Sequence, residues 1–232
     1  MGGKAVVLLS GGMDSATTLA IAKKEGFEIY SLSFEYGQRN SLEIKKAEKI
    51  AAFFGVKDHL IIPVPLKKIG GSSLTSEAMC LPRGRYLGEI GKGIPSTYVP
   101  ARNTIFLSYG LAWAEVLGAG DIFIGVNAID CSGYPDTRPE YIYAFEHMAN
   151  LATKAGIEGK VQFKIRTPLI NLSKADIIRK GMELGVDYSL THSCYDPFPN
   201  GVACGECDSC RLRLKGFEEA GFKDPIIYKE VR

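Results

Sequence analysis

Short apolar runs alternate with longer stretches of helical periodicity through most of the chain. The runs with the length and β-branched content of buried strands are residues 5–9, 28–34, 58–64, 121–126 and 161–165. Helices are predicted at residues 15–24, 41–54, 104–117, 139–155 and 174–184, the last between Ser173 as N-cap and Gly185. This alternation predicts an α/β fold with an open, mostly parallel five-stranded sheet and helices on both faces.

Two segments interrupt the alternation. Residues 65–100 are rich in glycine and have no clear period, which predicts a lid, a partner surface or a partly disordered stretch. After Val186 the pattern of strands and helices stops and a cysteine-rich segment begins. We therefore predict two units, an α/β domain at residues 1–186 and a small C-terminal subdomain at residues 187–232.

The first strand leads directly into the sequence Ser-Gly-Gly-Met-Asp-Ser at residues 10–15. A strand, a glycine turn and the start of a helix at Ser15 would direct several free N–H groups at one point, where an anion binds. The lysine of the G-x-x-x-x-G-K-[ST] loop is absent, so this loop is not the phosphate loop of kinases and GTPases. The sequence predicts a different kind of phosphate cradle, and the alternative is an ordinary Gly-Gly turn.

Three polar clusters belong at the same edge of the predicted sheet, because each adjoins an element that ends there. Their side chains are Tyr36, Gln38 and Arg39 after the second strand, Arg102 and Asn103 before a helix, and Asp130, Tyr134, Asp136 and Arg138 after the fourth strand. Each cluster taken alone is also consistent with a solvated loop. Together they predict a pocket for an anionic, planar, hydrogen-bonding ligand.

Four cysteines in the C-terminal segment have the spacing of a metal knuckle: Cys194, Cys204, Cys207 and Cys210. Four thiolates close a tetrahedral shell around Zn²⁺ and leave no position for water, so we predict a structural zinc. A catalytic zinc or an iron–sulfur cluster is the alternative. His192 lies two residues before Cys194, but we expect it to be a solvent-facing or hydrogen-bonded loop histidine because four ligands are already present.

Composition narrows the class of protein. The 232 residues are 46% hydrophobic, and 28 Lys and Arg against 26 Asp and Glu give a formal charge of +2, so no nucleic-acid partner is demanded. The apolar run at residues 5–9 is too short for a signal peptide, and no run is long enough to span a membrane. We expect a cytoplasmic protein, in which cysteines are free or bound to metal.

The motifs at residues 10–15, 36–39, 99–103 and 132–138, followed by the four C-terminal cysteines, resemble the 7-cyano-7-deazaguanine synthase family of queuosine biosynthesis. The resemblance covers nearly the whole chain. The first motif alone indicates only the PP-loop ATP pyrophosphatase superfamily, which includes NAD synthetase, GMP synthetase and tRNA thiolation enzymes. Thr137 stands where the family often has a cysteine, so the resemblance does not require a thiol nucleophile there.

The resemblance implies a ligase that converts 7-carboxy-7-deazaguanine and ammonia to the nitrile, using ATP with Mg²⁺ and carrying one structural zinc. Separately, we expect a cytoplasmic homodimer without direct contact with nucleic acid or membrane. Asp14 and Ser15 would be catalytic, and the nine residues of the three polar clusters would bind the substrate. The residues expected to bind ATP are Leu8, Leu9, Ser10, Gly11, Gly12, Met13, Asp14, Ser15, Ala16, Thr17 and Thr18.

Two other functions stay open from the sequence. A PP-loop enzyme of another branch, thiolating tRNA or forming an amide, would share the loop at residues 10–15 and the cysteine knuckle. It would also be expected to carry a basic appended module or a thiol near the adenylated base. A zinc-ribbon module that binds nucleic acid would explain the cysteines but would leave the glycine loop without a role.

Overall fold

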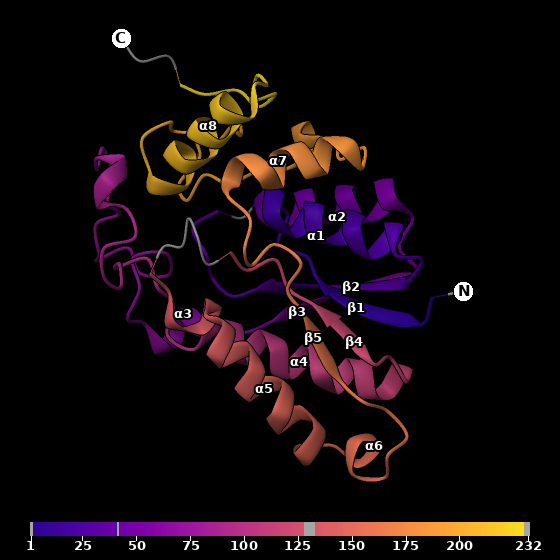
Figure 1. Ribbon diagram of the computed structural model, residues 1–232. Helices are drawn as coiled ribbons and strands as arrows, with labels where there is room; N and C mark the ends of the chain where they lie inside the picture. Colours follow the sequence, from indigo (N-terminus) through magenta and orange to yellow (C-terminus); the bar gives the residue numbers. More distant parts are fainter. Residues whose placement is uncertain (1, 41, 128–132, 230–232) are drawn as a thin grey trace.

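A computed structural model describes residues 2–40, 42–127 and 133–229 of the chain. Five parallel strands form one sheet in the order β3-β2-β1-β4-β5 (Figure 1). Their bounds are β1 (Lys4–Leu8), β2 (Glu28–Glu35), β3 (Asp58–Pro63), β4 (Asp121–Phe123) and β5 (Lys164–Arg166). In the centre of the sheet, Val6 of β1 pairs with Tyr30 of β2 on one side and Ile122 of β4 on the other.

Helices cover both faces of the sheet, as predicted (Figure 1). Helices α1 (Met13–Lys24), α2 (Leu42–Phe54) and α7 (Lys174–Glu183) lie on one face, and α4 (Arg102–Leu117) and α5 (Pro139–Ala152) lie on the other. The shorter elements are α3 (Leu66–Ile69), η1 (Leu87–Glu89), η2 (Pro135–Thr137), α6 (Lys154–Ile157) and η3 (Tyr188–Leu190). In the described part of the chain, no helix is both long and apolar enough to cross a bilayer.

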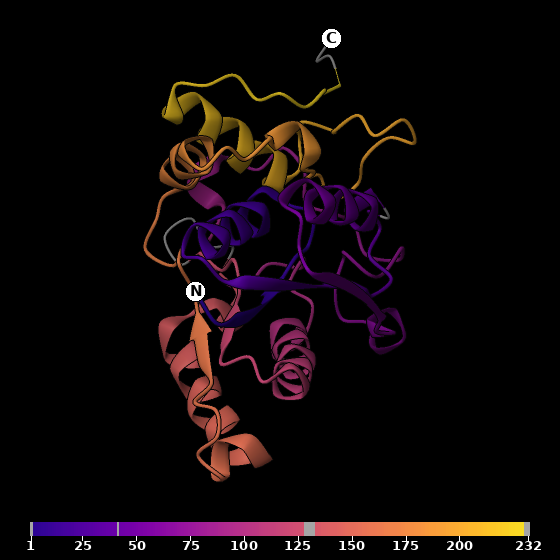
Figure 2. The same ribbon diagram turned by 90° about the vertical axis from the view of Figure 1, so that its right-hand side faces the viewer.

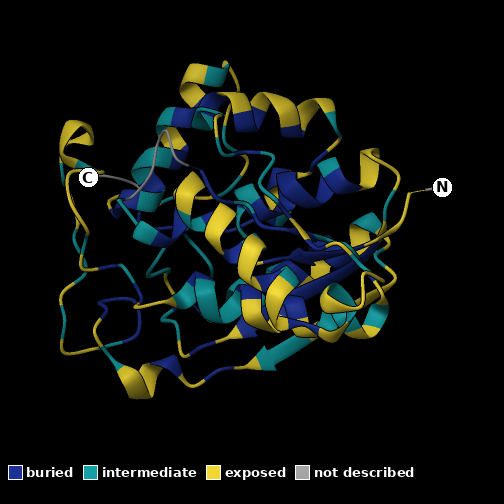
Figure 3. Ribbon diagram, turned by 60° about the horizontal axis from the view of Figure 1, so that its bottom comes forward, coloured by how far each residue is buried: buried dark blue, intermediate teal, exposed yellow. Residues whose placement is uncertain are grey.

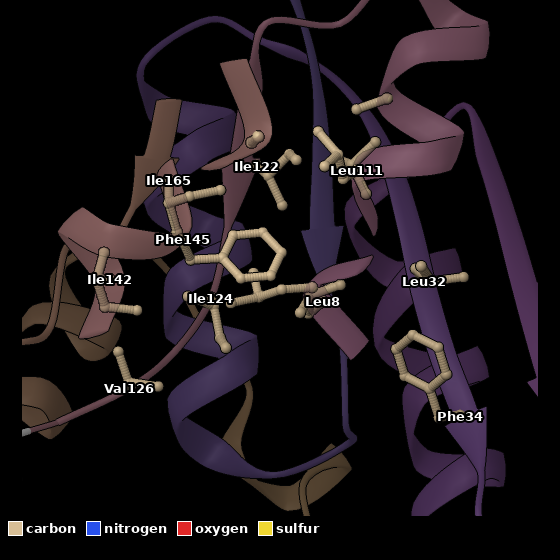
Figure 4. Packing of buried hydrophobic residues seen from close by; sticks show 14 of the residues in the cluster. Leu8, Leu32, Phe34, Leu111, Ile122, Ile124, Val126, Ile142, Phe145 and Ile165 are labelled. Atoms are coloured by element: carbon tan, nitrogen blue, oxygen red, sulfur yellow. The ribbon is translucent and has the colours of Figure 1, made fainter. Parts of the chain in front are cut away.

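Alternate residues of β1 enter two hydrophobic cores. Val6 and Leu8 pack with residues of α4 and α5, and this core is shown in Figure 4. Ala5 and Val7 point to the opposite face and pack with residues of α1, α2 and α7. Figure 3 shows the buried residues gathered along the sheet and on the inner sides of the helices. A strand that is buried on both faces must be apolar throughout, which explains the unbroken run at residues 5–9.

Several predicted ends differ from the observed ones. The expected helix at residues 139–155 is broken at Thr153, whose backbone is extended (φ −111°, ψ 147°) and whose hydroxyl accepts from the Gly156 N–H. The expected strand at residues 161–165 starts only at Lys164, because the Asn150 side chain takes the Phe163 N–H at 2.9 Å. The expected strand at residues 121–126 ends at Phe123. Helices α1 and α4 each begin two residues earlier than expected.

The C-terminal segment packs onto the α/β layers through α8 (Asp208–Ala220), which lies on the side of α7 that faces away from the sheet (Figure 1 and Figure 2). Arg213 of α8 is fully buried and forms a double ion pair with Asp224, with distances of 2.8 and 3.0 Å. Its Nη1 also donates to the Thr191 hydroxyl at 2.7 Å. The Arg213 guanidinium thus links α8 to the residue after η3 and to the chain after α8. The domain boundary near residue 186 stays a prediction.

Residues 65–100 are bound to the rest of the structure by side-chain contacts. The Arg39 guanidinium donates to the carbonyl oxygens of Ser73, Ser76 and Met79 at 2.6 to 3.0 Å. Arg85 forms an ion pair with Asp208 at the start of α8. The segment is therefore tied both to the chain after β2 and to the C-terminal segment.

Candidate active site

A cavity of about 300 Å³ lies at the carboxyl ends of β1, β2 and β4. Strand β1 lies between β2 and β4, so the chain leaves β1 toward one side of the sheet and later returns on the other. Ligands of open parallel sheets bind at such a reversal. The predicted residues that line the cavity are Leu8, Leu9, Ser10, Gly12, Met13, Asp14, Ser15, Tyr36, Arg102, Asn103 and Tyr134.

The loop after β1 has the geometry of an anion cradle. The Ser15 hydroxyl donates to the Gly12 carbonyl at 3.0 Å and accepts from the Ser10 N–H at 3.1 Å, which holds the loop against the first turn of α1. Within the described chain, no acceptor is present for the N–H groups of Met13, Asp14 and Ser15. These N–H groups and the positive end of the helix dipole favour an anion here.

Gly11 is required by close packing behind the cradle. Its φ is +83°, and a Cβ at this position would lie 2.3 Å from the carbonyl oxygen of Glu43 in α2. Gly125 after β4 is also restricted, since a Cβ there would lie 2.9 Å from the Thr18 hydroxyl oxygen. Both glycines let neighbouring backbones approach the loop.

Asp14 and Lys174 connect the first turns of two helices at the cavity wall. The Lys174 ammonium lies 3.0 and 2.8 Å from the two carboxylate oxygens of Asp14. Lys174 is the first residue of α7, directly after Ser173, which forms a capping box with Asp176. The sequence pattern predicted this helix start but not the lysine's role, because the two residues are 160 positions apart.

Arg102 contributes a guanidinium to the lining of the cavity. It lies 6.0 Å from the ring centroids of both Tyr36 and Tyr134, where it makes cation–π contacts. Ala101 before it has a left-handed backbone (φ 54°), the one such non-glycine residue in the described part of the chain. The Asp136 carboxylate accepts from the Asn103 N–H at 3.0 Å and so satisfies the start of α4. The left-handed residue and this hydrogen bond lie at the start of α4, where Arg102 is the first residue.

Other predicted site residues lie behind the cavity or outside it. Arg39 binds the backbone of residues 73–79, and Gln38 accepts from the Tyr36 N–H at 2.8 Å. Arg138 is exposed, with its Nε donating to the Pro135 carbonyl. The predicted residues that do not line the cavity are Gly11, Ala16, Thr17, Thr18, Gln38, Arg39, Asp136 and Arg138. Asp130 lies outside the described residues.

The side chains of Thr17 and Thr18, which were predicted to bind ATP, contact other protein groups and do not line the cavity. Thr17 is fully buried and its hydroxyl contacts the Tyr188 hydroxyl at 2.8 Å. The Thr18 hydroxyl donates to the Asp14 carbonyl at 2.9 Å, as threonine often does inside a helix. The spacing of the motif could not reveal this orientation, which depends on what packs against each side of α1.

Besides Lys174, three ionisable residues that the sequence analysis did not assign to the cavity line it: Glu43 of α2, His192 and Tyr195. Burial raises the pKa of Glu43 to about 7, although the nearby Arg102 opposes the shift. His192 is the hydrogen-bonded of the two predicted kinds of loop histidine, not the solvent-facing one: it is buried and its Nε2 contacts the Gly201 carbonyl at 3.2 Å, and burial lowers its pKa. Asn40 donates to His192 Nδ1 at 3.2 Å and accepts from the Leu42 N–H at 3.0 Å, which joins the start of α2 to this histidine.

The four predicted metal ligands come together in a buried cluster at the start of α8. The sulfur atoms of Cys194, Cys204, Cys207 and Cys210 all lie within 4.8 Å of one another. A tetrahedral zinc site with Zn–S bonds of about 2.3 Å has sulfur atoms roughly 4 Å apart. Backbone N–H groups of Cys204 and Cys207 donate to two of the sulfur atoms at 3.3 Å, which favours thiolates. The donor set therefore fits a closed zinc shell.

Comparison with known proteins identifies the family. The family model described as queuosine biosynthesis protein QueC matches residues 4–221. The chain belongs to the QueC family. A 7-cyano-7-deazaguanine synthase from Geobacter metallireducens is 63% identical to it over 229 residues, which cover 99% of this chain and 94% of the relative. Another from Syntrophus aciditrophicus is 66% identical over 224 residues, covering 97% and 96%. The resemblance inferred from the motifs is confirmed.

A more distant protein shares the fold. A 4-thiouridine synthetase, solved in complex with RNA and with bound ATP, has a TM-score of 0.51 and 21% sequence identity. The match covers 94% of this chain and 50% of that protein. The sheet, the helices on both faces and this likeness confirm the predicted fold class.

Proposed function

We propose that this QueC-family chain is an ATP-dependent ligase that converts 7-carboxy-7-deazaguanine and ammonia into 7-cyano-7-deazaguanine, a precursor of queuosine. The observation that carries the proposal is the single cavity joining the anion cradle of residues 10–15 to Arg102 and two tyrosine rings. A nucleotide phosphate fits the first wall, and a planar substrate with a carboxylate fits the second. The names of its near relatives support the same reaction.

The reaction needs a nucleotide because ammonia does not displace the oxygen of a free carboxylate. Attack of the substrate carboxylate on the α-phosphorus of ATP forms an acyl adenylate and releases pyrophosphate. Ammonia then displaces AMP and gives the amide. The amide oxygen attacks a second ATP, and loss of AMP from that adduct leaves the nitrile.

The cradle would bind the phosphates. The N–H groups of Met13, Asp14 and Ser15 would donate to phosphate oxygens, and the Lys174 ammonium, 2.8 Å from Asp14, stands next to them. Asp14 would hold Mg²⁺ beside the triphosphate, since a carboxylate at this position supplies the hard oxygen ligand that the ion prefers. Mg²⁺ held there would supply positive charge to neutralise the phosphates.

Arg102 would bind the substrate carboxylate. Among the described residues, no carboxylate lies within ion-pair distance of its guanidinium, so its charge is available to a ligand. The rings of Tyr36 and Tyr134 flank it and offer flat apolar surface to a planar base. Arg138, exposed and bound to the Pro135 carbonyl, is placed less well for this role.

The zinc would be structural. The four cysteines close its coordination shell, and none of them lines the cavity. A bound ion would fix the start of α8, on which Arg213 and the chain to Asp224 depend. The metal would thus hold the wall of the cavity in place without taking part in the chemistry.

Mass spectrometry of the products tests the proposal. The purified protein is supplied with ATP, ammonium and 7-carboxy-7-deazaguanine, and we expect the nitrile together with AMP and pyrophosphate. Product that stops at the amide, a thioamide formed when sulfide is supplied, or ADP in place of AMP would each indicate another branch of the fold. We also propose a cytoplasmic homodimer, and light scattering during gel filtration tests the dimer.

A further inference from the structure

Glu43 lies directly behind the anion cradle and faces the same cavity. It is the second residue of α2, and its backbone carbonyl is the group against which Gly11 packs. It lines the cavity, as Ser10 and Arg102 do, and the charge of Arg102 is close enough to act on its carboxyl group. The carboxyl group therefore shares one cavity with the place for a phosphate and the place for a substrate carboxylate.

The Glu43 carboxyl group differs from the other carboxyl groups nearby. Asp14 is held by Lys174, and Asp136 accepts from the Asn103 N–H at 3.0 Å. Glu43 makes no hydrogen bond or ion pair with another described residue, and its interaction with the Arg102 charge acts from beyond contact distance. A half-buried carboxyl group without a protein partner, facing a cavity, is available to a bound ligand.

Other ionisable groups share the cavity with Glu43. They come from α1, α4, α7, the chain after β2, the segment before α5 and the segment before α8, and are Asp14, Arg102, Lys174, Tyr36, Tyr134, His192 and Tyr195. Of these, Arg102 stabilises the ionised form of Glu43, while burial disfavours it and is the larger effect. The resulting pKa of about 7 lets the group gain and lose a proton near neutral pH.

We propose that the Glu43 carboxylate accepts the proton that ammonia must lose when it attacks the adenylated substrate. This step rests on the proposed function. The nitrogen lone pair forms a C–N bond to the acyl carbon and gives a tetrahedral intermediate with a positive nitrogen. One N–H proton passes to the carboxylate, the C–O bond to AMP breaks, and the amide and AMP remain. The Glu43 proton then returns to water.

The proton transfer lets the intermediate go forward. While the nitrogen of the tetrahedral intermediate stays positive, loss of AMP would give an N-protonated amide, which is a strong acid and high in free energy, so the intermediate instead loses ammonia and returns to the adenylate. Removal of the proton turns the nitrogen into a poor leaving group, and AMP departs. A positioned base is typically worth about 100-fold to 10,000-fold in such a step. The preceding adenylation needs no base, because the substrate carboxylate is itself the nucleophile.

The variant Glu43→Gln separates the two steps, because it keeps the size of the side chain and removes the base. Adenylation is measured as exchange of labelled pyrophosphate into ATP in the presence of 7-carboxy-7-deazaguanine without ammonium. We expect this exchange to stay within about threefold of wild type, while amide formation falls at least about 100-fold. Glu43→Asp, which keeps a carboxylate, should recover part of the loss. Glu48→Gln, at an exposed position on the same helix, is the control.

The pH profile gives an independent reading. With the free ammonia concentration held constant, amide formation by the wild type should rise through an apparent pKa near 7, and Glu43→Gln should lack this limb. Normal amide formation in Glu43→Gln overturns the proposal. Loss of pyrophosphate exchange in Glu43→Gln also overturns it, because Glu43 would then be a substrate ligand. Recovery of amide formation by this variant at high Mg²⁺ overturns it as well, because Glu43 would then be a metal ligand. If the wild type itself shows no exchange dependent on 7-carboxy-7-deazaguanine, the proposed function fails and the proposal with it.

Discussion

Replacing Arg102 with alanine should separate the two ligands of the cavity. The change removes a guanidinium that faces the proposed carboxylate position and leaves the cradle at residues 10–15 intact. We expect binding of 7-carboxy-7-deazaguanine to weaken strongly and binding of ATP to stay within a few-fold of wild type.

The size of the effect follows from the contacts of Arg102. A guanidinium that pairs with a ligand carboxylate in a desolvated site contributes roughly 2–5 kcal/mol, judged by removal of one partner. At about 1.4 kcal/mol for each factor of ten, this corresponds to about 30-fold to 4,000-fold in Kd. The cost to the fold is smaller, because alanine breaks two cation–π contacts at 6.0 Å, each worth about 0.5–1 kcal/mol, and two long hydrogen bonds of 3.4 Å to Asn103 Oδ1.

Isothermal titration calorimetry of each ligand measures the two affinities. Arg138→Ala is the matched control, because Arg138 belongs to the same predicted pocket but is exposed and does not line the cavity. Thermal melting of both variants checks that they are folded. Normal substrate binding by Arg102→Ala, or equal losses for both ligands, would refute the assignment of Arg102 to the carboxylate.

Three further predictions concern the cradle, the metal and the buried ion pair. Asp14→Asn should fold normally but lose most turnover, since it removes the carboxylate beside the phosphates, and wild-type activity in a steady-state assay would contradict this. Cys207→Ser should lower zinc content and Tm together, whereas a zinc-depleted protein with unchanged Tm and no activity would make the metal catalytic. Arg213→Ala should destabilise by about 3–5 kcal/mol in urea unfolding, because it leaves Asp224, 4% exposed, buried without its partner; a loss below 1 kcal/mol would contradict it.

The boundaries of elements were harder to predict than their existence. The strand at residues 161–165 was placed by its apolar run, but Asn150 on α5 takes the N–H of Phe163 and delays the start of the ladder to Lys164. The helix at residues 139–155 has a continuous pattern, yet the Thr153 hydroxyl caps a new short helix and breaks it. Both differences come from single side-chain hydrogen bonds that hydrophobic periodicity does not contain.

The candidate site was predicted most accurately where its residues are close in sequence. The cradle lies within residues 10–15, and three of the four metal ligands lie within residues 204–210. The pocket residues were predicted less well, because a polar loop residue can face a ligand or a neighbouring carbonyl. Arg102 faces the cavity, whereas Arg39 binds the carbonyl groups of residues 73–79, and nothing in their local sequence distinguishes them.

The sequence by itself determined the parallel α/β class, the anion cradle and the cysteine cluster, because periodicity and short spacing express local geometry. Only the tertiary structure decided the strand order β3-β2-β1-β4-β5 and which polar groups share the cavity. Lys174 reaches Asp14 across 160 residues, and Glu43 reaches the cavity because Gly11 lets α2 approach the loop. Such contacts depend on how helices pack on the sheet, and that packing is set by the whole core, which no local pattern encodes.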